Sequence, residues 1–410
     1  MSKKIVLRAR LLVALMVLGL IFGAVDASSQ DFGDKMSSIT LTVYGNANGD
    51  LVIDEQDIDY INGIIAGNKE KTILADANLD GVISEDDIKQ IQAIMDHTAT
   101  KLHYVDIDGQ DSSVTLPVES IVVSYTKYAE IVRVLGAADK IIGIDDAIAK
   151  YPTFFPELCN LPSFGDRFKP DAEKILALKP DVFYTGTRNS YDPELENKLA
   201  GIDVVRLPSW ESGKTISGIL VLSYILGKED KAYEYLKWHD DILHDIQTRV
   251  GAIPEDEKVT VLLDSVGNKA RGVGSGDLEN SEIAGAVNIG RELDEGIYPV
   301  YDTEWAIQKD PDHIISIITA GYNANITPLK ERLDLVKDTF RVTSSAKNDN
   351  IHVLAFDITN GASYLVSIAY EAKWFYPELF EDLNPQKIHQ DYIDRFCGIS
   401  LDVSNYGFAL

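Results

Sequence analysis

The sequence predicts an α/β protein with two similar halves joined by one long helix, and a small duplicated helical module in front of them. From residue 103 onward, apolar runs typical of strands alternate with amphipathic runs typical of helices, which favours mainly parallel sheets. A polar-faced stretch without Gly or Pro interrupts this alternation at residues 231–250. A loop-and-helix pattern occurs twice between residues 46 and 96. Together these three observations define the predicted fold class.

The composition narrows the classes of partner. The chain has 410 residues, of which 45% are hydrophobic and 25% charged, so it is long enough for two or three domains. Its 65 acidic residues outnumber its 38 basic residues and give a formal charge of −27. A surface of this charge repels nucleic acids and anionic membranes, and we therefore exclude both as partners.

The N-terminus has the features of an export signal. Basic residues within the first ten positions precede an apolar run at residues 11–24, and small residues follow at the spacing of a cleavage site. We predict a signal peptide at residues 1–27 and an exported protein, in the periplasm or at the extracellular face of the membrane. An uncleaved membrane anchor is the alternative, although the run is short for a full span.

The duplicated module is predicted at residues 41–100. Residues 46–57 (NANGDLVIDEQD) and 76–87 (DANLDGVISEDD) align, and each is followed by a short helical pattern. A calcium loop places oxygen ligands at its first, third, fifth, seventh, ninth and twelfth positions, and it needs Gly at the sixth for a sharp turn. The spacing therefore predicts two calcium loops.

The two copies differ in quality. The predicted calcium ligands of the second copy are Asp76, Asn78, Asp80, the Val82 carbonyl, Ser84 and Asp87, with Gly81 at the turn. In the first copy Asn46 replaces the leading carboxylate and Leu51 replaces the turn glycine. Weaker binding is predicted there, through Asn46, Asn48, Asp50, Asp54 and Asp57. An acidic surface loop without metal is the alternative for each copy.

The doubled unit resembles a dockerin domain, the small calcium-folded module that docks onto cohesins. The resemblance covers residues 41–100, and it implies structural calcium and a cohesin-like partner. A module of this size has little core of its own, so calcium would supply much of its folding free energy.

The two halves that follow contain matching sequence motifs. Residues 170–186 (PDAEKILALKPDVFYTG) and 301–317 (YDTEWAIQKDPDHIISI) each place a Glu near a helix start, then Pro-Asp at a turn, then an apolar strand. A residue before proline leaves the helical region, so each turn delivers the next strand into a sheet. We predict a first lobe at residues 103–228, a bridging helix at 229–252 and a second lobe at 257–410.

These phrases, with residues 116–145 (LPVESIVVSYTKYAEIVRVLGAADKIIGID) and 372–380 (AKWFYPELF), resemble the substrate-binding proteins of ABC importers for iron-siderophores, haem and cobalamin. The resemblance spans residues 103–398 and implies two Rossmann-like lobes with a ligand in the cleft between them. It also implies that Glu173 and Glu304 dock to the membrane permease. Without the resemblance, both would be read as ordinary carboxylates at helix N-termini.

Candidate ligand residues follow the predicted strands, because α/β folds bind small molecules there. Tyr offers a flat apolar face to a chelate, and Arg pairs with carboxylate or phosphate groups on it. The first-lobe candidates are Tyr125, Tyr128, Tyr151, Arg167, Tyr184 and Arg188. The second-lobe candidates are Arg271, Tyr298, Tyr301, Tyr322 and Tyr364. The motifs favour Tyr125 and the three Arg.

The leading hypothesis is a protein that captures an iron(III) chelate, or a related corrinoid or haem, and hands it to an ABC permease without catalysis. No paired metal-ligand histidines, nucleophile motif or phosphate-binding loop occurs in the sequence. His239 and His244 are predicted to be surface residues of the bridging helix. Cys159 and Cys397 either form a disulfide or remain separate buried thiols. The alternative function is a cohesin-binding interaction protein, in which the large domain is cell-surface cargo.

Overall fold

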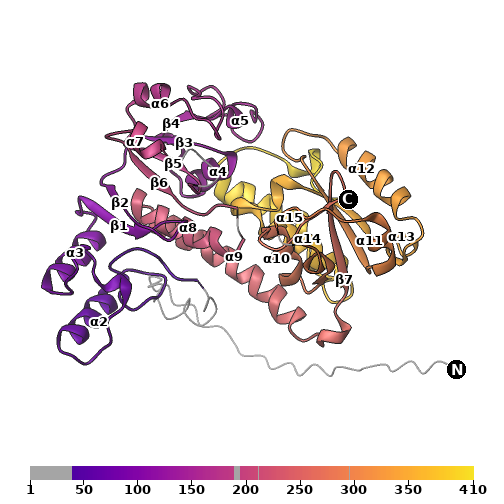
Figure 1. The fold of residues 1–410 in the computed structure, drawn as a ribbon, viewed down its shortest axis with the longest axis horizontal. Helices are drawn as coiled ribbons and strands as arrows, with labels where there is room; N and C mark the ends of the chain where they lie inside the picture. Colours follow the sequence, from indigo (N-terminus) through magenta and orange to yellow (C-terminus); the bar gives the residue numbers. More distant parts are fainter. Residues whose placement is uncertain (1–38, 189–193, 211, 295) are drawn as a thin grey trace, which may run out of the picture.

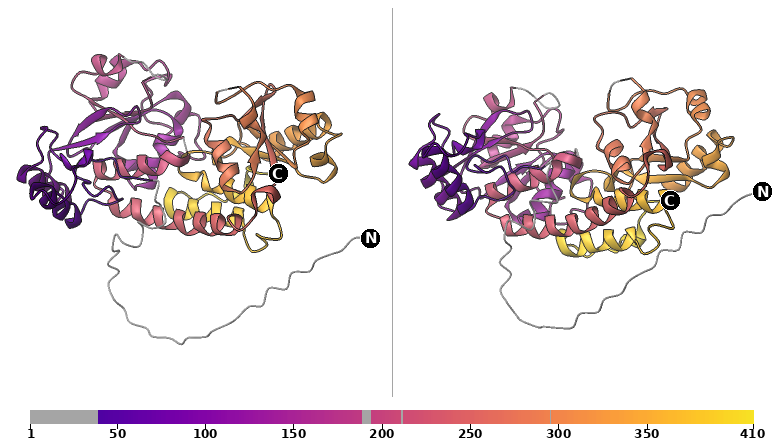
Figure 2. Two further views of the ribbon diagram at one scale, coloured as in Figure 1. Left: turned by 60° about the horizontal axis from the view of Figure 1, so that its bottom comes forward. Right: turned by 90° about the horizontal axis from the view of Figure 1, so that it is seen from below.

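The computed structural model describes residues 39–188, 194–210, 212–294 and 296–410 (Figure 1). Two α/β lobes lie side by side, and one long helix runs beneath both of them (Figure 2). The duplicated module lies against the first lobe, on the side away from the second lobe (Figure 1). The predicted signal peptide lies outside the described residues. Within those residues, no helix combines the length and the apolar character that a membrane crossing requires.

The duplicated module contains two matching helices, α2 (Glu55–Ile65) and α3 (Glu85–Met95). Each begins with a capping box, in which the cap side chain accepts a backbone N–H and a carboxylate three residues later accepts the N–H of the cap residue. Asp54 and Asp57 form the box of α2, and Ser84 and Asp87 form that of α3. The ninth and twelfth positions of each predicted calcium loop therefore also start the helix that follows.

The module is joined to the first lobe without an exposed linker. Strands β1 (Lys101–Val105) and β2 (Asp111–Thr115) form an antiparallel hairpin. The N-terminal residues 42–44 run along β1, where Tyr44 N donates to the His103 carbonyl at 2.9 Å. On the opposite side, Ile53 N donates to the hydroxyl of Tyr224 at 2.8 Å. Hydrogen bonds therefore connect the module to the first lobe across the predicted boundary near residue 100.

The first lobe is built on a four-stranded parallel sheet of order β4-β3-β5-β6. Its strands are β3 (Ile121–Val123), β4 (Ile141–Ile144), β5 (Val182–Thr185) and β6 (Asp203–Arg206). Its helices are α4 (Thr126–Val134), α5 (Asp146–Ala149), α6 (Ala172–Leu178) and α7 (Leu195–Lys198). The strands are short and largely buried, as expected for a parallel sheet covered on both faces.

Two helices follow the first-lobe sheet: α8 (Ser212–Leu226) and then the long bridging helix α9 (Glu229–Val250). The bridging helix α9 begins at the predicted residue and ends two residues before the predicted end. Its first turn carries Glu229 and Asp230 and its last turn Arg249, which suits the helix dipole. One face of α9 is buried, and it includes Tyr235, Trp238 and His239.

The second lobe contains a five-stranded sheet in which β11, β10, β7 and β8 lie in that order and β9 also pairs with β7. Only β8 is antiparallel to its neighbour. The strands are β7 (Thr260–Ser265), β8 (Lys269–Ala270), β9 (Val287–Asn288), β10 (His313–Ile318) and β11 (Ile351–Ala355). The helices are α10 (Gly276–Ile283), α11 (Thr303–Lys309), α12 (Thr327–Thr339), α13 (Ser344–Lys347), α14 (Leu365–Phe375) and α15 (Pro385–Tyr392).

Candidate ligand-binding cleft

A cavity of about 420 Å³ lies between the two lobes, which is within the usual size range of small-molecule sites. The first lobe contributes Tyr125, Arg167, Phe168 and Trp210 to its lining. The second lobe contributes Gly274, Ser275, Gly276, Asp277, Ile297, Tyr298, Phe356 and Asn360. Most of these residues follow the carboxyl ends of parallel strands or the loops next to them, where α/β folds bind ligands.

The first-lobe wall is held in an unusual backbone conformation. Tyr125 follows β3 and starts α4 with a φ of 69°, a value that non-glycine residues rarely adopt. Its N–H donates to the carboxylate of Asp145 at 2.9 Å, and the same carboxylate caps α5. Such strain persists only where surrounding bonds fix it, and it is concentrated at functional positions.

The guanidinium of Arg167 stacks on two rings of this wall, at 4.2 Å from the centre of Tyr125 and 4.7 Å from that of Phe168. Among the residues that the structure describes, no carboxylate forms an ion pair with it. Arg167 therefore presents a positive charge to the cavity between flat aromatic surfaces.

The second-lobe wall is a glycine-rich loop that is hydrogen-bonded to a neighbouring loop. Gly272 N donates to the Ile297 carbonyl at 3.0 Å, and a side chain at Gly272 would collide with the carbonyl of Gly296. This close approach requires glycine, and it presents Ile297 and Tyr298 to the cavity. Ser275 then caps α10 through the N–H of Leu278.

Arg271 lies behind this wall rather than on its surface. It is buried, and its guanidinium lies over the rings of Tyr298 at 4.9 Å and Phe356 at 5.3 Å. It also pairs with the buried Asp277 at 3.3 Å. Burial raises the pKa of Asp277, and the positive charge of Arg271 opposes that shift. Arg271 is thus paired within the wall, whereas Arg167 lines the cavity and forms no ion pair among the described residues.

Six of the predicted tyrosines do not line the cavity. Tyr128 and Tyr184 pack together in the first-lobe core, with ring centres 4.6 Å apart. The hydroxyls of the other four bond to protein side chains: Tyr151 to Asp357, Tyr301 to Asp264, Tyr322 to His389 and Tyr364 to His239. Burial or an internal hydrogen bond therefore accounts for each of them.

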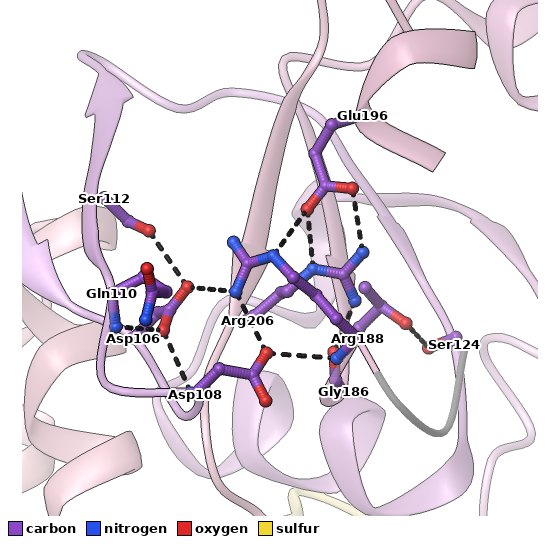
Figure 3. Close-up of polar contacts among 10 residues, drawn as sticks. Asp106, Asp108, Gln110, Ser112, Ser124, Gly186, Arg188, Glu196 and Arg206 are labelled. Carbon is purple, nitrogen blue, oxygen red and sulfur yellow. Dashed lines mark hydrogen bonds and ion pairs between the residues drawn. The ribbon is translucent and has the colours of Figure 1, made fainter. Parts of the chain in front are cut away.

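Arg188 was also predicted to contact ligand, but it belongs to a polar network with Asp106, Asp108 and Glu196 (Figure 3). Its guanidinium binds Asp106 at 2.7 Å and Asp108 at 2.9 Å, and it approaches Glu196 at 3.5 Å. The buried Arg206 shares Glu196, at 2.8 Å, and also donates to the carbonyl of Gly186. Asp106 and Asp108 lie in the loop between β1 and β2, so their bonds to Arg188 join this loop to the first lobe.

The sequence-based reading missed several residues of the lining. Trp210 follows β6 and Phe356 directly follows β11, so the strand-end rule that selected the tyrosines could have found both. Phe168 adjoins Arg167 and stacks on it.

Glu173 and Glu304 occupy equivalent positions on the two lobes. Both are exposed and lie in the first turns of seven-residue helices, α6 and α11. Asp171 and Asp302 cap these helices in the same way, through the second and third backbone N–H groups after the cap residue. The repeated phrases in the sequence thus correspond to repeated structure.

The predicted calcium loops fold as compact turns. In the second loop, the carboxylate of Asp76 accepts the N–H groups of Asp80 and Gly81, and that of Asp87 accepts those of Asn78 and Ser84. In the first loop, Asn46 is buried and its side-chain amide donates to the carbonyls of Leu41 and Asp50, which a carboxylate could not do. In the described part of the chain, no three His, Cys, Asp or Glu side chains are gathered to hold a metal ion.

Two other predictions concern burial. His239 is buried in α9 and shares a 2.6 Å hydrogen bond with the hydroxyl of Tyr364, so its predicted surface location is wrong. Burial lowers the pKa of His239 to about 4. His244 is exposed, as predicted. Cys159 and Cys397 are separate thiols rather than a disulfide.

Two α/β lobes, a single long bridging helix and a cavity between the lobes define a bilobal solute-binding protein. The periplasmic binding protein family model matches residues 121–355, more than half of the chain, and the chain belongs to this family.

Three similar proteins support the assignment. The uncharacterized ABC transporter substrate-binding lipoprotein YvrC of Bacillus subtilis is 23% identical over 68% of this chain and 86% of its own length. The iron-uptake system-binding protein of the same organism is 24% identical over 41% of this chain and 51% of its own length. The structure of MolA from Haemophilus influenzae, bound to molybdate, has a TM-score of 0.61 at 20% identity and covers 73% of this chain and 98% of its own. These relatives are binding proteins rather than enzymes, which agrees with the lack of a catalytic motif in the sequence.

Proposed function

We propose that this protein is the extracytoplasmic solute-binding component of an ABC importer, and that its cleft captures an anionic iron(III) chelate. The observation that carries the proposal is Arg167, an arginine without an ion-pair partner among the described residues, set between aromatic rings in the cavity. The remainder of the molecule is strongly acidic, with a net charge of −27. A cationic cleft in such a protein selects an anion.

The surfaces around this charge favour an organic chelate over a small oxyanion. Five aromatic residues line the cavity, namely Tyr125, Phe168, Trp210, Tyr298 and Phe356. Flat aromatic faces bury ligand surface without demanding hydrogen bonds, and they suit the aromatic or conjugated groups of a chelator. A bare oxyanion would instead need a dense set of N–H and O–H donors. Molybdate, the ligand of the similar MolA structure, is therefore the less suitable class here.

A ligand panel tests the proposal directly. The purified protein is titrated with the ferric complex of 2,3-dihydroxybenzoate, ferric citrate, haemin, cyanocobalamin and sodium molybdate, with the fluorescence of Trp210 and neighbouring aromatic residues as readout. We expect the ferric catecholate or citrate complex to bind with a micromolar or lower Kd. Preference for molybdate, or no binding below about 100 μM across the panel, would overturn the assignment of an iron chelate.

Delivery to the permease is proposed to use Glu173 and Glu304. The pair is supported by their exposure, by their equivalent places on α6 and α11, and by the identical capping of the two helices. One carboxylate from each lobe can engage basic residues on a permease of matching two-fold geometry.

We also propose that the two loops of the module bind calcium as a structural ion. Two features support the proposal: Asp57 and Asp87 are fully buried carboxylates, and among the described residues no donor reaches the side-chain oxygen of the buried Asn46. Adding calcium to chelator-treated protein should raise its Tm, and Asp76→Ala with Asp80→Ala should reduce that increase. A Tm that is independent of calcium would exclude the ion.

A cohesin-anchored function is not favoured. The module packs its first loop and its residues 42–44 against the first lobe, and the family match lies entirely in the two lobes. A calcium-dependent pull-down with a cohesin remains the direct test of that alternative.

A further inference from the structure

A buried polar network crosses from one lobe to the other behind the cavity walls. Its centre is Lys127 of α4, a first-lobe residue whose side chain is only 5% exposed. The ammonium donates to Glu130 one turn along the same helix, at 2.9 Å. It also donates across the interface to the backbone carbonyl of Asp357, at 2.6 Å, and approaches the hydroxyl of Ser363 at 3.4 Å.

Glu130 is satisfied across the same interface. Its side chain is 1% exposed, and one carboxylate oxygen binds Lys127 while the other accepts the hydroxyl of Tyr392 at 2.6 Å. Tyr392 belongs to α15 of the second lobe. A buried ion pair of the first lobe therefore completes its hydrogen bonding with groups of the second.

The network is attached to both walls of the cavity. Lys127 lies two residues after Tyr125, and Asp357 directly follows Phe356. Ser363 donates to the carbonyl of Asp357 at 3.1 Å, which anchors the second-lobe segment that carries Phe356 and Asn360. A shift of Lys127 relative to Asp357 would move the two aromatic walls relative to each other.

The backbone of the second lobe passes close to the Lys127–Glu130 pair at Gly361. Gly361 has a φ of 70°, and a side-chain carbon there would lie 2.5 Å from Cδ of Lys127 and 2.9 Å from a carboxylate oxygen of Glu130. Both the backbone conformation and the space demand glycine. The second-lobe loop thus fits directly onto the ion pair.

A buried ion pair is a poor source of net stability, because the cost of desolvating two charges commonly offsets their attraction. Apolar side chains of similar size would fill the same space without that cost. Directional bonds, however, fix one relative position of two surfaces, which apolar packing does less strictly. We propose that Lys127 and Glu130 are positioning residues that set the separation of the two cleft walls and thereby the affinity for ligand. The affinity part of this inference rests on the proposed function; the geometric part does not.

The test replaces both charges at once, so that neither is left buried alone. In Lys127→Met/Glu130→Met, spin labels on Lys174→Cys of α6 and Asp338→Cys of α12 report the distance between the lobes, in a Cys159→Ser background. Both labelled side chains are exposed, at 59% and 80%. We expect a broader or longer distance distribution without ligand, and a Kd for ferric 2,3-dihydroxybenzoate raised by about tenfold or more, since small misplacements of binding groups are costly.

Arg332→Met is the matched control, because Arg332 pairs with the buried Asp264 within the second lobe alone. It should lower stability without changing the distance between the lobes. Gly361→Ala provides a second perturbation. Its added methyl group would collide with the intact Lys127–Glu130 pair, so this variant should also widen the distribution of distances between the lobes. An unchanged distance in both Lys127→Met/Glu130→Met and Gly361→Ala would overturn the inference. So would a changed distance accompanied by unaltered affinity for a ligand that binds the parent protein.

Discussion

At the scale of single residues, Arg167 and Arg188 differ in their partners more than in their chemistry. Arg167 stacks on rings in the cavity, whereas Arg188 is held by Asp106 and Asp108 (Figure 3). The sequence offered the same reason to choose both, namely an arginine in a loop after a predicted strand. Only the packing of the β1–β2 hairpin against the first lobe distinguishes them.

Replacing Arg167 should weaken binding without weakening the fold. In Arg167→Gln the cation is lost but the aromatic surfaces remain, so we expect the Kd for the bound ferric chelate to rise about 10- to 100-fold, equivalent to roughly 1.5–3 kcal/mol. Titration by fluorescence gives the Kd, and urea unfolding checks that stability changes by less than about 0.5 kcal/mol. Equal affinity in the variant and the parent protein would remove Arg167 from the binding site.

Replacing Arg188 should have the opposite effect. Asp106 is largely buried and would lose a charged partner in Arg188→Gln, so we expect a loss of about 1–3 kcal/mol in the free energy of unfolding. The Kd for ligand should stay within about twofold of the parent value, which corresponds to less than 0.5 kcal/mol. The two arginine variants serve as controls for each other. If both changed the Kd and the free energy of unfolding alike, the assignment of Arg167 to binding and Arg188 to stability would be wrong.

His239 should make the stability depend on pH. Its folded pKa, lowered by burial to about 4, lies below the ordinary value of about 6.5. The unfolded chain therefore takes up a proton between these values while the folded chain does not, and stability is lost as the pH falls through this window. We expect the stability gap between the parent protein and His239→Gln to narrow by about 2 kcal/mol between pH 7.5 and pH 5.

Urea unfolding at the two pH values measures this gap. His244→Gln is the control, because His244 is exposed on the same helix and its replacement should leave the pH dependence unchanged. A gap for His239→Gln that is constant with pH would show that folding leaves the pKa of His239 unchanged.

At the scale of elements, the repeated phrases of the sequence predicted structure well. α6 and α11 have the same length, the same Asp cap and the same left-handed residue after the last turn, at Lys179 and Asp310. Local chemistry decides these features, because capping and the residue before proline act within a few positions. The bridging helix was predictable for a similar reason, as a long stretch free of Gly and Pro.

The equivalence of α6 and α11 leads to a prediction about transport. Glu173→Arg with Glu304→Arg should abolish uptake of the ferric chelate in cells that carry the cognate permease, while ligand affinity in vitro stays unchanged. The reason is electrostatic: reversed charges repel the basic docking residues that the carboxylates are proposed to meet. Uptake of radiolabelled iron measures the effect.

Glu85→Arg with Glu378→Arg is the matched control for that experiment. Both residues are exposed carboxylates outside α6 and α11, and Glu85 also begins a helix. The control should transport normally. Normal uptake by the Glu173/Glu304 variant would remove these residues from the permease contact.

At the scale of the whole molecule, the sequence predicted the two lobes and the cleft but only part of the lining. Which tyrosine faces the cavity depends on contacts between segments far apart in the chain, such as that of Tyr364 with His239 of the bridging helix. The packing of the duplicated module against the first lobe also depends on contacts between distant segments, so the local sequence pattern did not predict it. Its boundary looked like a domain boundary because the local pattern changes there, whereas hydrogen bonds between distant segments join the two parts.

The module and the first lobe should therefore unfold as one cooperative unit. The hydroxyl of Tyr224 accepts the N–H of Ile53 in the first loop and bonds to Tyr233, whose own hydroxyl reaches the carbonyl of Leu51. Tyr224→Phe leaves the N–H of Ile53 buried without this partner, which should cost about 1–3 kcal/mol. Native-state hydrogen exchange reports the opening free energy of amides in α2, α3 and the central strand β5.

In a cooperative unit, Tyr224→Phe lowers the protection of all three elements by the same free energy, since they open together. Tyr60→Phe on α2 is the control, because Tyr60 is half-buried and its ring contact is with Lys69 of the same module. That substitution should leave β5 unaffected. Loss of protection in α2 and α3 alone after Tyr224→Phe would instead mean that the module opens as an independent domain, as its sequence pattern suggested.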